Sequence, residues 1–479
     1  MTSALRDSAD SPSVLSDELP LRAELFGAAQ MEQHGTTLAN AHRLGEGAAR
    51  DLLLSRLADN EAVIIDACNL LTETVRAKRQ ITPAAEWLLD NFYLIEDQIR
   101  TAKRHFPKTY SKQLPRLSTG PSAGRPRVYD IALETISHGD GRVDPESLSR
   151  FVAAYQRVTP LQLGELWAIP IMLRLALIEN LRRVAARLNA SRIDRNLADS
   201  WADRMTDTAD KTPGDLILVV ADMARSEPSL SGAFVSELTR RLQGQNPLLA
   251  LPLTWITQRL LDSGETIEQL VQADAQQQAS DQVSVSNSIG SLRFLGAMDW
   301  RDFVETMSLV EYTLLRDPSA TYAAMDFSTR DRYRHMIEKM ARGTDHSEDH
   351  IAAAAIDLAE QAARRYGASH RTAHVGHYLI GAGLAALERA IALRLTAAQQ
   401  LEHVIARRPL PIYLCAIAVP MLALTLIILW KTSSSMPPLY VIFIVGMLGL
   451  LSASQLGITL VNWVATLLAT PHQIGRAHV

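Results

Sequence analysis

The stretch LPIYLCAIAVPMLALTLIILW, residues 410–430, contains no charged side chain. At a rise of about 1.5 Å per residue, a helix of this length spans roughly 30 Å, the thickness of a bilayer's hydrocarbon core. After a short polar connector, residues 439–468 form a second long uncharged stretch, in which Gly446 and Gly449 would allow close helix contact. The sequence therefore predicts a two-helix transmembrane hairpin over residues 410–430 and 439–468.

Basic residues predict the orientation of this hairpin. Arg407 and Arg408 directly precede the first span, whereas the connector carries only Lys431. The positive-inside rule therefore predicts that the region before the hairpin is cytoplasmic and that membrane lipid is a partner. Residues 1–21 are polar and lack the apolar core of a signal peptide, so we expect a disordered N-terminus.

The region between this N-terminus and the hairpin has helical apolar spacing, so the predicted fold class is all-α. A polar stretch rich in Gln and Ser, residues 276–288, suggests a boundary between two cytoplasmic helical domains at residues 22–275 and 289–408. The net charge of −4 in 479 residues provides no basic field, which excludes nucleic acid as the main partner.

Two helices in this region have specific sequence signals. The segment EWLLDNFYLIEDQIR, residues 86–100, should form one helix that begins after a cap at Thr82 and packs Trp87 and its leucines inward. A second helix should follow Thr159, and Pro170 inside it should kink or interrupt it.

Several polar groups in the sequence are candidates for metal-binding or catalytic sites. The motif HSEDH at residues 346–350 lacks the HExxH order of zinc hydrolases, so we expect no metal site there. Carboxylate pairs such as Glu134 and Asp140 are typical of caps and solvated faces. No motif identifies a catalytic, cofactor-binding or metal-binding residue.

Charged residues inside apolar helical patterns form the most informative set. Structural ion pairs are the favoured interpretation, because an unpaired buried charge costs several kcal/mol. The alternative is a carbohydrate-binding groove in which Trp87, Glu165 and Trp167 contact glucan. A hydrolase using Glu96 and Glu165 would need the two carboxyls to face each other across a cleft. The charged set comprises Asp90, Glu96, Glu165, Arg174, Glu179, Arg182 and Arg183.

Read together, six segments make the chain resemble the N-terminal region of cyclic β-1,2-glucan synthases. They keep the family's order and cover nearly the whole chain. They are LRAELFGAAQMEQHGTTLA at 21–39, EWLLDNFYLIEDQIR at 86–100, QLPRL with GRPRVYDIALE at 113–134, LGELWAIPIMLRLALIENLRR at 163–183, the run at 284–335 that begins SVSNSIGSLRFLGAMDW, and HVGHYLIGAGLAALE at 374–388.

The resemblance implies a large bacterial inner-membrane glycosyltransferase that uses UDP-glucose, with a divalent metal, and carries a phosphorylase-like domain near its far end. The catalytic acids of that family would lie beyond residue 479. The resemblance thus implies that the present chain is a fragment without catalytic residues or cofactors of its own and that its partners are the downstream catalytic domains. Whether the chain is itself an enzyme stays open.

Two further readings follow from the resemblance and the end of the sequence. The chain is expected to act as a scaffold and membrane anchor; the alternatives are a glucan-binding module or the N-terminal region of a related phosphorylase-type carbohydrate enzyme. Residues 474–479, IGRAHV, back-translate to a common sequencing adapter. We therefore expect this tail to be non-native.

Overall fold

The computed structural model describes residues 24–45, 53–106, 113–392, 409–433 and 438–468. The predictions for residues 1–21 and 474–479 lie outside the described residues. The described chain is all-α, as predicted, and contains no strand, only isolated β-bridges near residues 44, 116, 117 and 126. The helices are α1 (Ala28–Ala41), α2 (Leu53–Arg76), α3 (Pro83–Asp90), α4 (Phe92–His105), α6 (Arg127–His138), α7 (Pro145–Gln156), α8 (Leu163–Lys211), α9 (Leu216–Ser226), α10 (Gly232–Leu242), α11 (Ala250–Ser263), α12 (Ile267–Ala297), α13 (Trp300–Met307), α14 (Leu309–Leu314), α15 (Phe327–Ala341), α16 (Glu348–Tyr366), α17 (Gly376–Leu379), α18 (Leu384–Ala390), α20 (Pro409–Ser433) and α21 (Leu439–Leu468), with short 3₁₀ turns at Pro213–Asp215, Pro247–Leu249, Tyr322–Ala324 and Arg371–Ala373.

Internal packing divides the chain into two compact units. The first, hereafter the helical unit, comprises Met1–Glu338 and Ser347–Leu387; the second comprises Lys339–His346 and Glu388–Val479 and contains α20 and α21. Helices on both sides of residues 276–288 belong to the helical unit. The predicted domains at 22–275 and 289–408 stay a prediction.

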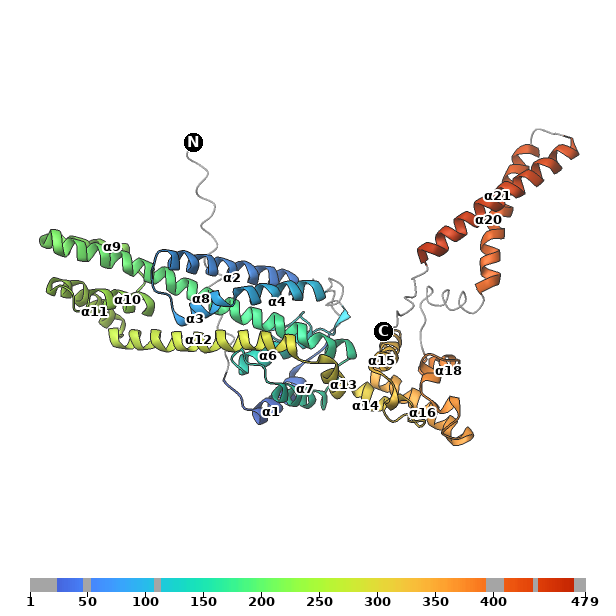
Figure 1. The fold of residues 1–479 in the computed structure, drawn as a ribbon, viewed down its shortest axis with the longest axis horizontal. Coiled ribbons are helices and arrows are strands. Elements are labelled where there is room, and N and C mark those ends of the chain that lie inside the picture. The colour runs from blue at the N-terminus through green and yellow to red at the C-terminus, as the bar shows by residue number, and fades with distance from the viewer. Residues whose placement is uncertain (1–23, 46–52, 107–112, 393–408, 434–437, 469–479) are drawn as a thin grey trace, which may run out of the picture. The chain divides into compact units, whose positions relative to one another are not determined.

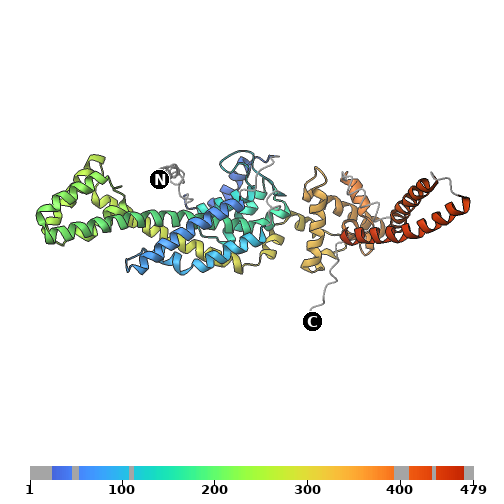
Figure 2. The same cartoon turned by 90° about the horizontal axis from the view of Figure 1, so that it is seen from above.

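The helical unit is organised around α8, which is 49 residues long. Helices α2, α4, α6 and α12 pack along it, and Figure 1 shows α12 running beside α8. A first hydrophobic core surrounds the N-terminal half of α8, up to Leu188. A second core begins at Ala198 and is completed by α9, α10 and α11. Figure 2 shows these three helices gathered at the end of α8. One helix therefore carries two cores in succession.

The local signals in the sequence were right about where helices begin and less reliable about where they continue. Thr82 caps α3 by accepting a hydrogen bond from the Ala85 amide, as predicted. The predicted helix at 86–100 is instead divided at Asn91, whose side chain is bound between the Trp87 carbonyl and Arg293. These bonds hold Asn91 in a non-helical conformation. Pro170 does not interrupt α8, which continues through it.

The polar stretch at 276–288 is continuous helix inside α12 and is not a linker. Two of its serines are buried and accept hydrogen bonds: Asn180 of α8 donates to the hydroxyls of Ser284 and Ser288, both at 3.0 Å. The small side chain of Ser288 also admits the turn at Gly141, where φ is +78° and a Cβ would collide with the Ser288 hydroxyl.

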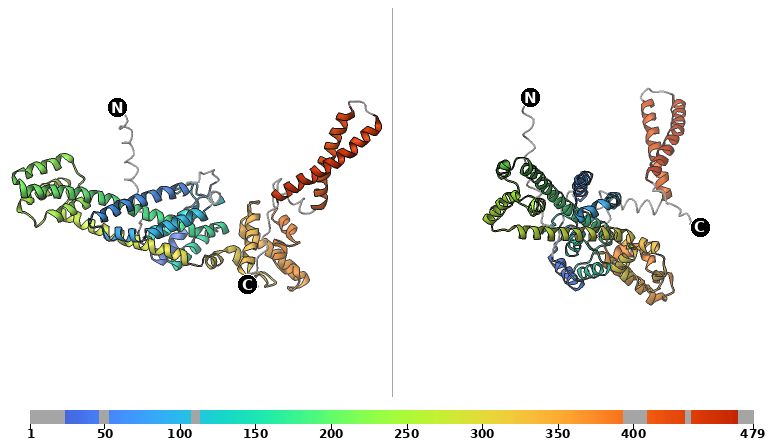
Figure 3. Two further views of the ribbon diagram at one scale, coloured as in Figure 1. Left: turned by 45° about the horizontal axis from the view of Figure 1, so that its top comes forward. Right: turned by 60° about the vertical axis from the view of Figure 1, so that its left-hand side comes forward.

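Two helices in the second unit are long and apolar enough to cross a membrane, over Tyr413–Thr432 and Leu439–Val464. Both panels of Figure 3 show α20 and α21 lying side by side. Gly446 and Gly449 face Leu429 and Ile428 of α20, which confirms the close helix contact predicted from these glycines. Large apolar side chains on the outside stay uncovered: Phe443 is 71% exposed and Leu426 is 64% exposed.

Candidate functional site

Buried carboxylates in α8 are the most prominent polar feature of the helical unit. Glu179 is fully buried in the first core. Arg56 of α2 donates to it through Nε at 2.9 Å and Nη2 at 2.6 Å, and Asn60 donates at 2.8 Å. Arg182 and Arg183 complete the cluster, each at 3.1 Å. Burial would raise the pKa of Glu179, but Arg56 and its neighbours outweigh burial and lower the pKa to about 2.

Glu165, one of the predicted glucan contacts, is also fully buried. It forms a bidentate pair with Arg127 of α6, both bonds at 2.6 Å, and also accepts a hydrogen bond from the Gln162 amide at 2.9 Å. Burial opposes the charge on Arg127, but Glu165 outweighs burial and raises the pKa of Arg127. Both carboxylate oxygens of Glu165 are therefore bound at the start of α8, and neither is free to accept a hydrogen bond from a sugar.

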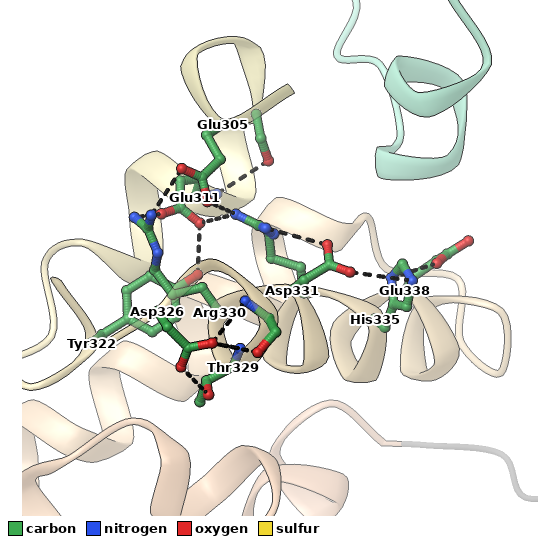
Figure 4. Close-up of polar contacts among 12 residues, drawn as sticks. Glu305, Glu311, Tyr322, Asp326, Thr329, Arg330, Asp331, His335 and Glu338 are labelled. Carbon is green, nitrogen blue, oxygen red and sulfur yellow. Dashed lines mark hydrogen bonds and ion pairs between the residues drawn. The ribbon is translucent and has the colours of Figure 1, made fainter. Parts of the chain in front are cut away.

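A third buried network joins α13, α14 and α15, and it was not recognised from the sequence. Arg334 is fully buried and donates to Glu305 at 2.9 Å and to Glu311 at 2.7 Å. Arg330 bridges the same two carboxylates at 2.8 and 2.9 Å, as Figure 4 shows. The Tyr322 hydroxyl donates to Glu311 at 2.6 Å, and burial together with Glu311 raises the pKa of Tyr322.

These networks confirm the predicted ion pairs of Glu165, Glu179, Arg182 and Arg183, whereas Arg174 donates to the neutral Gln98 and Asp90 is exposed on α3. They also bear on the hydrolase hypothesis, because Glu165 is sealed by Arg127 whereas Glu96 is exposed on α4 near Arg100, at 3.7 Å. An acid and a base for glycoside hydrolysis must face each other across a cleft that admits the substrate. Glu96 and Glu165 have no such arrangement.

The three predicted glucan contacts do not line one groove. Trp87 lies on α3 with 41% of its surface exposed, so the prediction that it packs inward was wrong. Trp167 lies near the start of α8, partly buried, with its ring edge-on to Phe327. Thr82, Pro83 and Ala85, at the start of α3, line a cavity with Leu188, and Leu188 follows Trp167 by roughly 30 Å of helix. The two tryptophans therefore sit near opposite ends of the first core.

The cavity with Leu188 lies where the two cores meet on α8. Its volume is about 650 Å³, and α2, α3, α8, α10 and α12 contribute to its wall. The lining is unusually basic, with six cationic and three acidic side chains. The cationic residues are Lys78, Arg79, Arg192, Arg195, Arg240 and Arg241, and the acidic residues are Asp199, Glu237 and Asp274.

Ion pairs cross this cavity, but they are less complete than those around Glu179. Arg195 binds Asp274 at 2.6 Å, and Arg192 reaches Asp199 at 3.3 Å. Asp199 and Glu237 repel each other; burial and Glu237 together raise the pKa of Asp199, whereas Arg240 helps to lower that of Glu237. No aromatic side chain lines the cavity, so it lacks the stacking surface that sugar rings favour. The excess of cationic over acidic side chains in the cavity suits an anion better than a neutral glucan.

Comparison with known proteins gives the context for these features. No family model matches the chain. Over 426 residues it is 33% identical to the cyclic β-(1,2)-glucan synthase NdvB of Rhizobium meliloti (strain 1021), a match that covers 88% of the chain. The chain is homologous to a cyclic β-(1,2)-glucan synthase. This confirms the resemblance seen in the six sequence segments.

The homology covers a small share of the synthase. The matched region is 15% of the length of NdvB, so the activity named for the whole relative does not transfer directly to this chain.

Proposed function

We propose that the chain is the membrane-anchored helical scaffold of a cyclic β-(1,2)-glucan synthase. Its homology to NdvB over 88% of its length carries the proposal. In this account α20 and α21 lie in the bacterial inner membrane, and the helical unit lies in the cytoplasm, where it supports the UDP-glucose-dependent catalytic domains of the same polypeptide. Membrane lipid and those domains are the partners, and any divalent metal needed for glucosyl transfer would belong to the catalytic domains.

Three observations favour a scaffold role over a catalytic role. The buried carboxylates Glu165, Glu179 and Glu311 are each neutralised by arginine, so they are committed to structure. The uncovered apolar side chains of α20 and α21 need a nonpolar solvent. The positive residues Arg407 and Arg408 precede α20, which favours the cytoplasmic orientation of the helical unit.

Replacement in the relative tests this function directly. The region of the R. meliloti synthase that matches this chain is exchanged for the chain, and membrane vesicles are assayed for cyclic glucan made from UDP-glucose. We expect synthesis to depend on the region: deletion abolishes it and the exchange restores it. A deletion variant that still makes cyclic glucan at the normal rate would contradict the scaffold role.

Calorimetry with β-1,2-glucan separates the scaffold from the glucan-binding alternative. The full chain in detergent micelles is titrated with linear and with cyclic glucan. We expect no binding at micromolar concentrations, since Glu165 is sealed and the cavity on α8 has no aromatic wall. Specific micromolar binding that is lost on Trp87→Ala would instead support the glucan-binding module.

A further inference from the structure

Two histidines and a glutamate come together where α1 meets α6. Glu134 and His138 are one turn apart on α6, so their side chains share a face of that helix. His34 reaches them from α1, and its Nε2 lies 2.8 Å from Glu134 Oε2. His138 Nε2 lies 3.2 Å from the same oxygen. The three potential ligand atoms all lie within 4.8 Å of one another.

The surroundings fix the ring of His138 so that one nitrogen faces the cluster. Its Nδ1 lies 2.7 Å from the Glu24 carbonyl oxygen, a partner that can only accept. In the neutral ring the proton therefore sits on Nδ1, and the lone pair on Nε2 points toward Glu134 and His34. Histidine ligands of metals are oriented in this way by a carbonyl or carboxylate on the second ring nitrogen.

Aromatic rings hold the two imidazoles from outside. Phe26 stacks on His138 with ring centroids 3.8 Å apart, and Phe151 stacks on His34 at 5.9 Å. The cluster keeps an outlet to solvent, because the side chains of His34 and Glu134 are 22% and 30% exposed whereas that of His138 is 10% exposed. The rings are thus held in place while one side stays accessible to water.

We propose that His34, Glu134 and His138 form a binding site for a divalent transition metal of the zinc class. Two imidazole nitrogens and one carboxylate oxygen are ligands that Zn²⁺ prefers, and three protein ligands leave a fourth position for water. On binding, the ion replaces the contacts of Glu134 Oε2 with His34 Nε2 and His138 Nε2; a proton on either Nε2 moves to Nδ1 of the same ring or is released to solvent. The site joins α1 and the chain segment before it to α6.

The same chain provides a matched control. His346 and His350 are also four residues apart, and they form the histidine pair that stands out in the sequence: His346 precedes α16, and His350 lies in its first turn. Among the described residues, three potential ligands meet at the His34 cluster, and the pair of His346 and His350 belongs to no such group. A spacing of four residues is therefore present in both places, and the third ligand from a second helix distinguishes the His34 cluster.

Cobalt titration tests the site on the full chain in detergent micelles after removal of metal with a chelator. Tetrahedral Co²⁺ has intense visible absorption, and Zn²⁺ should displace it. We expect one Co²⁺ per chain in the unaltered protein and in the His346→Ala/His350→Ala control. His34→Ala and His138→Ala should weaken binding by at least about tenfold.

A ligand-exchange variant keeps the test decisive if an alanine variant fails to fold. His34→Cys places a thiolate at the same position, so bound Co²⁺ should gain a sulfur-to-metal charge-transfer band in the near ultraviolet. Its appearance supports direct ligation by residue 34. Absence of Co²⁺ binding in the unaltered chain, or binding that persists in His34→Ala and disappears in the His346→Ala/His350→Ala control, would overturn the proposal.

Discussion

Helices α8 and α20 are both long and both contain an internal proline, yet they meet their surroundings in opposite ways. In α8 the apolar side chains are buried, and carboxylates among them are each paired with arginine from α2 or α6. In α20 the apolar side chains are exposed, and no charge interrupts residues 410–430. The difference indicates two solvents: protein interior for α8 and lipid for α20.

The comparison also shows what a buried charge requires. A carboxylate is tolerated inside α8 because neighbouring helices bring arginines to it, as they do at Glu179. A helix in lipid has few neighbours, so it excludes charge altogether. Charged side chains are frequent in α8 and absent from residues 410–430, so the two environments differ in whether they provide partners for charges.

Removing a buried carboxylate should have the largest effect. Glu179→Ala leaves Arg56, Arg182 and Arg183 close together without a counter-charge, which should cost about 3–5 kcal/mol of local stability. Hydrogen–deuterium exchange of α8 amides in the full chain measures this loss. The control is Glu96→Ala, whose exposed partner Arg100 is at the same i,i+4 spacing as the pair of Glu179 and Arg183. Equal exchange in the two variants would refute the assignment of Glu179 as a structural charge.

Acid should weaken the same region. The pKa of Glu179 is lowered from 4.5 to about 2, so its stabilisation is fully present above the ordinary carboxyl range and is lost as the pH falls toward 2. The shift corresponds to about 3 kcal/mol. Exchange of α8 amides, corrected for the intrinsic pH dependence of exchange, should accelerate between about pH 5 and pH 2. A corrected rate that stays flat over this interval would argue against the charged state of Glu179.

Introducing a charge into α20 should have an effect of about 2.5 kcal/mol on membrane insertion. Leu422→Arg places a cation on an exposed face of α20, where we expect lipid. Leu218→Arg on α9 is the matched control, since that leucine is likewise exposed but belongs to the second core's helices. Fractionation should show reduced membrane retention for Leu422→Arg alone. Similar retention of both variants would be evidence against a lipid-facing α20.

The smallest effect is expected where the ionic network is incomplete. Burial and Glu237 raise the pKa of Asp199, so folding disfavours its charged form and an uncharged side chain should be tolerated there. Asp199→Asn should change the stability of the second core by less than about 1 kcal/mol. Stability from Asp199 is present at pH values below its ordinary range and declines as the pH rises through its raised pKa, opposite in sign to Glu179. A loss as large as that of Glu179→Ala would show that Asp199 acts as a charged partner.

Much of the fold could be predicted from local signals. The hairpin followed from uncharged length, and the start of α3 followed from Thr82, because such features depend on adjacent residues. The break at Asn91 and the continuity of α12 through 276–288 depend on distant partners, Arg293 and Asn180. A serine buried between packed helices and a serine in a linker look the same in the amino-acid composition. The stretch at 276–288 was therefore interpreted as a boundary between domains, although it is helix.

For the candidate-site residues, too, the sequence predicted local features and missed contacts between distant residues. The presence of ion pairs was predicted from charges set among apolar residues, but their partners were not, because Arg127 and Arg56 come from other helices. The cluster of His34, Glu134 and His138 was missed because His34 lies 100 residues before Glu134, whereas the conspicuous pair at 346 and 350 is visible within one short stretch of sequence. Trp87 was expected inside because its helix was read as continuous.

Membrane extraction with protease mapping tests the central claim most directly. Membranes carrying the full chain are washed with alkaline carbonate, and protease is added to right-side-out and to inverted vesicles. Our account predicts that the chain stays in the membrane and that the helical unit is cut in inverted vesicles only. Release by carbonate, or digestion of the helical unit in right-side-out vesicles, would contradict a cytoplasmic scaffold anchored by α20 and α21.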